Sequence, residues 1–276
     1  MKFILLTTLL TASAVGTGSP VDVGGISIEI PAPANFTRVI PDMSKVNALQ
    51  SEFVPPGNDQ LAAFISQEDA PAALADEIPN LTRRFTVQVA TKIKAYSVSE
   101  GEFLQLKAMF KDNNEKLISD AKDKLTEPLA KASANVSKQL DTELSLKVSS
   151  IAPFPAHIDN DRMLAFSILA KNEIKTAEGT HIDISTNTTT LLYVNHRILF
   201  LYSYGGKDDL EWTREQSKEW ASSILGANHD SAQTTPISAH RNGINWARVV
   251  DKAIVGGLLG LILALIGWAT NRRKEN

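Results

Sequence analysis

Residues 182–206, IDISTNTTTLLYVNHRILFLYSYGG, contain the pattern that decides the fold. Ile182 and Ile184 open a long threonine-rich strand that ends near Val194, and a tight turn at 195–196 leads into a second strand at 197–204. The second strand is apolar on both faces, which predicts a central position in a sheet. Because so short a turn joins the two strands, they are expected to be antiparallel.

Further elements follow on either side of this pair. Periodicity predicts helices at 43–53, from 99 to about 140, and after Asp208 or Asp209, and Asp112-Asn113-Asn114 is expected to interrupt the second of these. The predicted fold class is therefore α+β, an antiparallel sheet covered by helices with a long helical insertion at about 99–141. Short apolar or alternating runs predict the remaining strands, at 26–30, 61–65, 85–93, 144–148 and 164–168.

A second informative stretch lies near the C-terminus, where residues 253–269 read AIVGGLLGLILALIGWA without a charge. As a helix it would span about 25 Å, close to the roughly 30 Å of a bilayer core. We expect a transmembrane helix at 249–270, with Trp246 and Trp268 as interfacial anchors. The alternative is a buried helix of a soluble core.

Small residues recur at intervals of four along this predicted span, at Gly256, Gly260 and Ala264. Such a line lets two helix backbones approach closely, so a homodimer through the span is one expected outcome. The span also makes membrane lipid an expected partner.

The N-terminus, MKFILLTTLLTASA, has one lysine, a short apolar core and small residues, which predicts a signal peptide at 1–18. An uncleaved anchor is the alternative. A cleaved signal and one late span give a type I, single-pass topology. The domain at 19–228 would then be periplasmic, followed by a tether at 229–248 and a cytoplasmic tail at 271–276. The short signal and the lack of cysteine favour a bacterial inner membrane.

Composition excludes several classes of function. The net charge of −3 gives no electrostatic case for a nucleic-acid partner. The absence of cysteine excludes disulfides and thiolate zinc sites.

The sequence also lacks a G-x-S-x-G elbow, a P-loop and an H-E-x-x-H motif, so no catalytic, cofactor-binding or metal residue is predicted. His157-Ile-Asp159 and His181-Ile-Asp183 are both interpreted as surface residues. The first lies in a proline-rich loop, and in the second Ile182 and Ile184 are expected to face inward. An aromatic set of Trp212, Tyr202 and Tyr204 is the one ligand candidate, with core packing as the alternative for the tyrosines.

The opening ISIEIPAPANFTRV (26–39), the meander and the closing helix LEWTREQSKEWASSILGAN (210–228) resemble the PsbP-like fold of extrinsic photosystem II subunits and a yeast Ran-binding protein. The similarity covers about residues 26–228 and rests on element order. It implies an accessory or binding module. The insertion at about 99–140 and the membrane span depart from the family pattern, and no functional residue is carried over.

These observations predict a membrane-anchored extracytoplasmic binding or accessory module without catalytic activity, with a protein partner on the outer side. One alternative is an envelope hydrolase or transferase with an unrecognised site. Another is a structural homo-oligomer assembled through the span.

Overall fold

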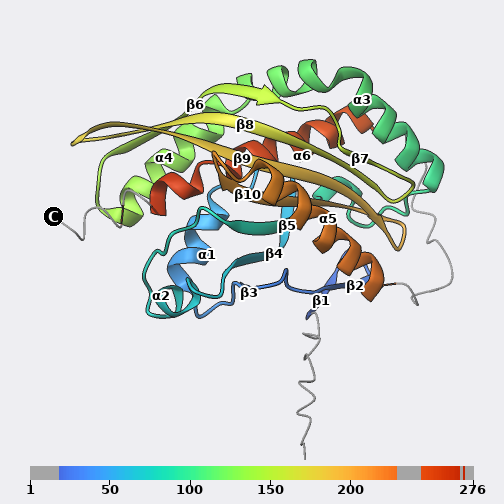
Figure 1. Cartoon of the computed structure of the whole chain (residues 1–276), viewed down its shortest axis with the longest axis horizontal. Coiled ribbons are helices and arrows are strands. Elements are labelled where there is room, and N and C mark those ends of the chain that lie inside the picture. The colour runs from blue at the N-terminus through green and yellow to red at the C-terminus, as the bar shows by residue number, and fades with distance from the viewer. Residues whose placement is uncertain (1–18, 229–243, 268–269, 271–276) are drawn as a thin grey trace, which may run out of the picture.

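The computed structural model describes residues 19–228, 244–267 and 270 (Figure 1). Its centre is an eight-stranded antiparallel sheet in the order β3-β4-β5-β10-β9-β8-β6, with β7 paired to β8. A separate hairpin of β1 and β2 packs beside α5. The strands are β1 (Ser19–Asp22), β2 (Ser27–Ile30), β3 (Phe36–Arg38), β4 (Asn58–Ser66), β5 (Arg84–Ala90), β6 (Leu144–Pro153), β7 (Ile158–Asp159), β8 (Met163–Thr176), β9 (Gly179–Val194) and β10 (Arg197–Gly206).

The β9–β10 hairpin is the core of this sheet. Its register runs without a break from Val194↔Arg197 to Ser185↔Gly206. Asn195 and His196 both have positive φ, 46° and 58°, as a two-residue hairpin turn requires. The central, antiparallel placement predicted for residues 197–204 is confirmed.

Helices cover both faces of the sheet (Figure 1). The helices are α1 (Ser44–Ser51), α2 (Ala70–Leu74), the 3₁₀ turn η1 (Thr91–Ile93), α3 (Glu100–Asp123), α4 (Thr126–Leu140), α5 (Leu210–Ala227) and α6 (Trp246–Gly260). The predicted α+β class, an antiparallel sheet covered by helices, is therefore confirmed.

One face of the sheet is covered by α5. The buried stripe of this helix includes Thr213, Ser217 and Trp220. The Trp220 ring packs edge-on against Phe64 and Phe85, and its Nε1 donates to the Pro31 carbonyl at 2.8 Å. This contact ties the helix to the segment that leads out of β2.

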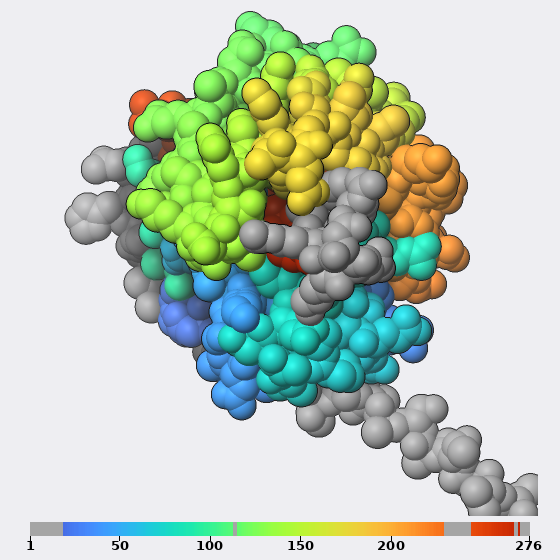
Figure 2. All heavy atoms as spheres, turned by 90° about the vertical axis from the view of Figure 1, so that its left-hand side faces the viewer, coloured from blue at the N-terminus to red at the C-terminus, as the bar shows by residue number. Residues whose placement is uncertain are grey.

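The opposite face is covered by α6, which lies against β5, β10 and β9. Helix α4 packs on β6, and α3 contacts both β6 and α6. The C-terminal helix is thus enclosed between the sheet and α3. In the space-filling view, the red atoms of α6 show only at the margin and in a narrow gap below the yellow-green segments (Figure 2).

One expectation for the helical insertion is wrong. Helix α3 continues through 112–114, and the break falls at Lys124–Leu125. Three polar residues of modest helix propensity cost less than is gained by burying Phe110 before them and Ile118 after them. The predicted capping box of Ser99 and Glu102 is confirmed.

Several predicted segments lie outside the described residues. They are the signal peptide (1–18), the tether as far as residue 243, Trp268 and the tail (271–276).

Candidate functional site

The surface of the sheet beneath α6 is polar, although the helix itself is apolar. Arg84 on β5 lies opposite Tyr204 on β10, which lies opposite Asn187 on β9. Cross-strand partners share a face, so these side chains form one row beneath α6. Two residues along, Thr86, Tyr202 and Thr189 form a second row, and Gln88 follows Thr86 on β5. We call this surface the polar strip, defined as Arg84, Thr86, Gln88, Asn187, Thr189, Tyr202 and Tyr204.

Glycines allow α6 to lie very close to the polar strip. An added Cβ at Gly256 would lie 2.5 Å from the Tyr202 hydroxyl, and one at Gly257 would lie 2.8 Å from Asn187 Oδ1. At Gly260 it would overlap the Tyr204 ring. A side chain at Gly256 or Gly260 would push the helix away from the sheet, whereas at Gly257 only the side-chain ends of Asn187 and Thr189 would have to shift.

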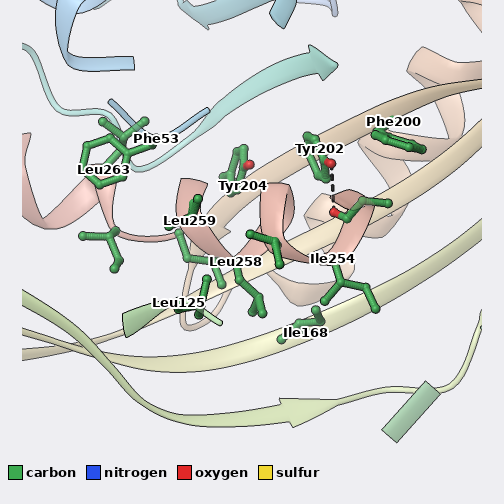
Figure 3. Close-up of a cluster of buried hydrophobic side chains, with 14 of the residues drawn as sticks. Phe53, Leu125, Ile168, Phe200, Tyr202, Tyr204, Ile254, Leu258, Leu259 and Leu263 are labelled. Atoms are coloured by element: carbon green, nitrogen blue, oxygen red, sulfur yellow. Dashed lines mark hydrogen bonds between the residues drawn. The ribbon is translucent and has the colours of Figure 1, made fainter. Parts of the chain in front are cut away.

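Side chains of the sheet donate hydrogen bonds to main-chain carbonyls of α6. The Tyr202 hydroxyl donates to Ala253 at 2.9 Å, as the dashed line in Figure 3 marks, and Arg84 Nη2 donates to Gly260. Three longer bonds extend this pattern along the helix. They run from Asn58 to Lys252 at 3.3 Å, from Tyr204 to Gly256 at 3.4 Å, and from Ser185 to Leu261 at 3.4 Å.

These bonds coincide with a break in the helix. Regular α-helix ends at Gly260, residues 261–262 form a turn, and helical structure resumes at 263. Such a break frees main-chain carbonyls, which need other donors when they are buried. Arg84 and Ser185 supply those donors at Gly260 and Leu261.

Arg84 is the most costly residue in this site. Its side chain is 1 % exposed, it donates to the Leu81 carbonyl at 2.7 Å, and its guanidinium stacks 4.1 Å from the Tyr204 ring centre. Burial lowers the pKa of Arg84 to about 10. Burial also raises the pKa of the Tyr204 hydroxyl to about 12, opposed by the nearby positive charge of Arg84.

Some polar atoms on the sheet surface beneath α6 have no hydrogen-bond partner. Among the described residues, Arg84 Nε and Asn187 Nδ2 are buried without an acceptor, and Asn58 Oδ1 is buried without a donor. No carboxylate among these residues forms an ion pair with Arg84. An unpaired buried charge costs several kcal/mol. The apolar helix therefore satisfies this surface incompletely.

The predicted aromatic ligand set does not form one site. Tyr202 and Tyr204 are fully buried beneath α6, whereas Trp212 lies on the opposite face of the sheet, beside Phe36 and Phe85. The Arg83 guanidinium covers the Trp212 ring at 4.6 Å. The expectation of a shared exposed surface is wrong, because the alternation of β10 directs both tyrosines away from α5.

The predicted transmembrane packing line has a place inside this fold. Gly256 and Gly260 face the tyrosines of the sheet, and Ala264 is buried in the same segment. Trp246 is half-buried at the start of α6. Small residues thus allow close approach here to a sheet, where the sequence predicted a second helix.

The two His-Ile-Asp motifs do not come together as a metal site. Asp159 pairs with Lys107 and Lys111, each at 2.6 Å. Among the described residues, no group of three or more His, Cys, Asp or Glu is placed to hold a metal ion. Ile182 and Ile184 are 49 % and 40 % exposed, so the expectation that they face inward is wrong.

Two open cavities lie away from the polar strip. One of about 630 Å³ is bounded by α3 and the 153–156 segment, with Phe110, Phe154 and Phe166 in its wall. The other, of about 370 Å³, adjoins the start of α6 and is lined by Lys92, Arg248 and Lys252 among others. Their rims are exposed charges, and neither holds a buried unpaired polar group.

No protein-family model and no curated protein matches this chain at a significant level.

Proposed function

We propose that this protein is a binding or accessory module of the bacterial cell envelope, without catalytic activity, held at the outer face of the inner membrane by its C-terminal helix (249–270). One observation carries the proposal. The segment Trp246–Gly267 is long and apolar enough to cross a membrane, with a mean hydropathy of 2.2 over its most apolar 18 residues, yet it rests on a polar surface of its own domain. Resemblance to the PsbP-like fold points to the same class of function and stays a prediction.

The apolar side chains of α6 do not decide between sheet and bilayer. Lipid tails are as apolar as leucine, so α6 gains about the same from leaving water in either place. The free-energy difference between the two positions comes from the groups that α6 uncovers when it leaves the sheet. Leaving the sheet would let water reach Arg84, Asn187 and Asn58, which favours the bilayer. It would also uncover the apolar surface of α3, which favours the docked position.

The break at 261–262 adds a condition for crossing. In a bilayer every main-chain carbonyl must be satisfied within the segment, because water is absent. The donors Arg84 and Ser185 would stay behind with the sheet. We therefore propose two positions for α6, a broken helix docked on the polar strip and a continuous helix across the membrane.

Reporter fusions test the anchored state. Alkaline phosphatase fused after residue 276 should be inactive and a fluorescent protein there should fluoresce, because the C-terminus would be cytoplasmic. The same reporters fused after residue 228 serve as the matched control and should give the reverse. Active phosphatase at both positions would contradict the anchor.

A second candidate function follows from the fit of α6 to the sheet. If α6 never leaves the polar strip, the protein is an exported binding module with a core helix, because the hydrogen bonds from Tyr202 and Arg84 hold it there. Active phosphatase at both fusion points, with the chain extracted from membranes by alkaline carbonate, would favour this function.

A further inference from the structure

We propose that the polar strip binds the anionic head of an acyl-chain molecule when α6 moves into the bilayer, and that docked α6 is the stand-in for this ligand. The inference rests on the proposed function, since it requires the helix to leave. Membrane anchoring by α6 does not explain why the surface beneath it is polar, whereas binding of an anionic lipid does.

The charge of Arg84 favours an anionic ligand. Arg84 is fully buried and has no carboxylate partner among the described residues. Its two acceptors, the carbonyls of Leu81 and Gly260, are neutral, and its Nε has none. A guanidinium binds carboxylate and phosphate oxygens more strongly than carbonyls and fits them in pairs. When α6 leaves, Nη2 loses Gly260 as its acceptor, while Nε already lacks one.

Hydrogen-bond donors surround Arg84 on the polar strip. The Tyr202 and Tyr204 hydroxyls donate to α6, and Asn187 Nδ2 is a buried donor without an acceptor. The polar strip therefore offers these donors to whatever lies on it, while its oxygens Asn187 Oδ1 and Gln88 Oε1 already accept from Thr189 and Asn58. In the docked position, the main-chain carbonyl of Gly260 at Arg84 occupies the place of the ligand's anionic head, and those of Gly256 and Ala253 lie further along the strip.

The surface that α6 covers also has an apolar side. Figure 3 shows Leu258 on the side of α6 away from Tyr202 and Tyr204, toward Leu125 and Ile168. On β8, Ile168 continues this apolar side and is buried, whereas Phe166 packs on Phe110 of α3 with ring centres 4.6 Å apart. If α6 left, this surface would meet water unless a long apolar group replaced the helix. An acyl chain with one anionic head matches both parts of this surface, the head at Arg84 and the chain along the apolar side.

A carboxylate of a free fatty acid and the phosphate of a phospholipid share this chemistry. The experiment uses the purified chain of residues 19–276 mixed with neutral phosphatidylcholine vesicles. Three photoreactive diazirine probes are compared: palmitate, phosphatidate and the methyl ester of the palmitate probe. Cross-linked peptides are located by mass spectrometry.

The expected label lies on the peptides that carry Ile168. The charged probe that gives it, palmitate, phosphatidate or both, identifies the source of the anionic head. The uncharged methyl ester should label these peptides about tenfold less, and so should Arg84→Gln with the charged probes, since a charge-assisted hydrogen bond is lost. Arg83→Gln is the matched control, because Arg83 is exposed beside Trp212 on the other face. It should label like the parent.

A cross-link that holds α6 in place gives a second, independent arm. An added Cβ at Gly257 would lie 2.9 Å from Thr189 Oγ1. A disulfide places two Cβ atoms about 3.8 Å apart, so Thr189→Cys with Gly257→Cys should form one in this cysteine-free chain. We call it the 189–257 cross-link. The oxidised chain should take up no label at these peptides, and reduction should restore it.

Equal labelling by the methyl ester, or equal labelling of the oxidised and reduced chains, would overturn the ligand proposal. The methyl-ester comparison needs no variant, so it holds even if Arg84→Gln folds poorly. Sedimentation with the neutral vesicles is measured in the same samples. A chain that sediments but takes no label at the strip refutes the ligand alone, whereas a chain that never sediments refutes the anchored function as well.

Discussion

Replacing Gly260 by leucine should displace α6 from the sheet while leaving its affinity for a bilayer intact. The Cα of Gly260 lies against the Tyr204 ring, and a side chain there would overlap it. Tyr204 cannot move aside easily, because it is buried between Arg84 and the helix. In lipid, a leucine at this place is favourable by about 0.5 kcal/mol.

The magnitude follows from the contacts at this point. Overpacking a buried site costs about 1–3 kcal/mol. The hydrogen bond of Arg84 to the Gly260 carbonyl contributes about 1.5–3 kcal/mol and that of Tyr204 to Gly256 about 1 kcal/mol. A loss of about 4 kcal/mol is therefore expected, which lowers the ratio of docked to released helix by about a thousandfold.

The measurement is the yield of the 189–257 cross-link, which reports how much of α6 is docked on the sheet. In aqueous buffer the chain with the two cysteine substitutions should cross-link nearly completely, and adding Gly260→Leu should reduce the yield severalfold. Gly226→Leu on α5 is the matched control, since an added Cβ there meets nothing within 4 Å. An unchanged yield with Gly260→Leu would refute the placement of this glycine against Tyr204.

Three further predictions concern the rest of the fold. Trp220→Phe should lower the free energy of unfolding in urea by about 1–3 kcal/mol, because the Pro31 carbonyl loses its donor; no change in the midpoint would contradict the role given to α5. Ser99→Ala should lower it by about 1 kcal/mol through loss of the capping box of α3, and Ser222→Ala on the exposed side of α5 should serve as a near-neutral control. Hydrogen bonds and charge from Lys107 and Lys111 hold the pKa of Asp159 below its ordinary value, so this pairing stabilises the fold at neutral pH and is lost as pH falls through that lowered pKa. Asp159→Asn should therefore flatten the fall in stability below about pH 4, and an unchanged acid profile would refute the pairing.

Most of the sheet could be predicted from the sequence because its signals are local. The run of residues 197–204 is apolar on both faces, and the turn at Asn195-His196 fixes its neighbour. The small elements β1, β3, β7 and α2 were not predicted, because each is five residues or shorter and lacks a periodic pattern.

The candidate site was much harder to predict because it depends on a pairing between distant segments. Arg84 and Gly260 are 176 residues apart, and nothing local links them. One local signal existed in STNTTT (185–190), where polar residues occupy both faces of a strand beside a central one. A strand of this kind is buried only if partners satisfy it, and α5 does so on one face through Thr213 and Ser217. The apolar run at 253–269 has the same composition whether it docks on a sheet or crosses a membrane, so hydropathy alone could not place it.

The most direct test of the two positions of α6 uses the purified, reduced chain with Thr189→Cys and Gly257→Cys. The chain is oxidised with and without neutral phosphatidylcholine vesicles, and the fraction that forms the 189–257 cross-link is compared. We expect nearly complete cross-linking in buffer and a large loss with vesicles, as α6 moves into the bilayer. Equal cross-linking under both conditions would show that α6 stays on the polar strip and does not enter the bilayer.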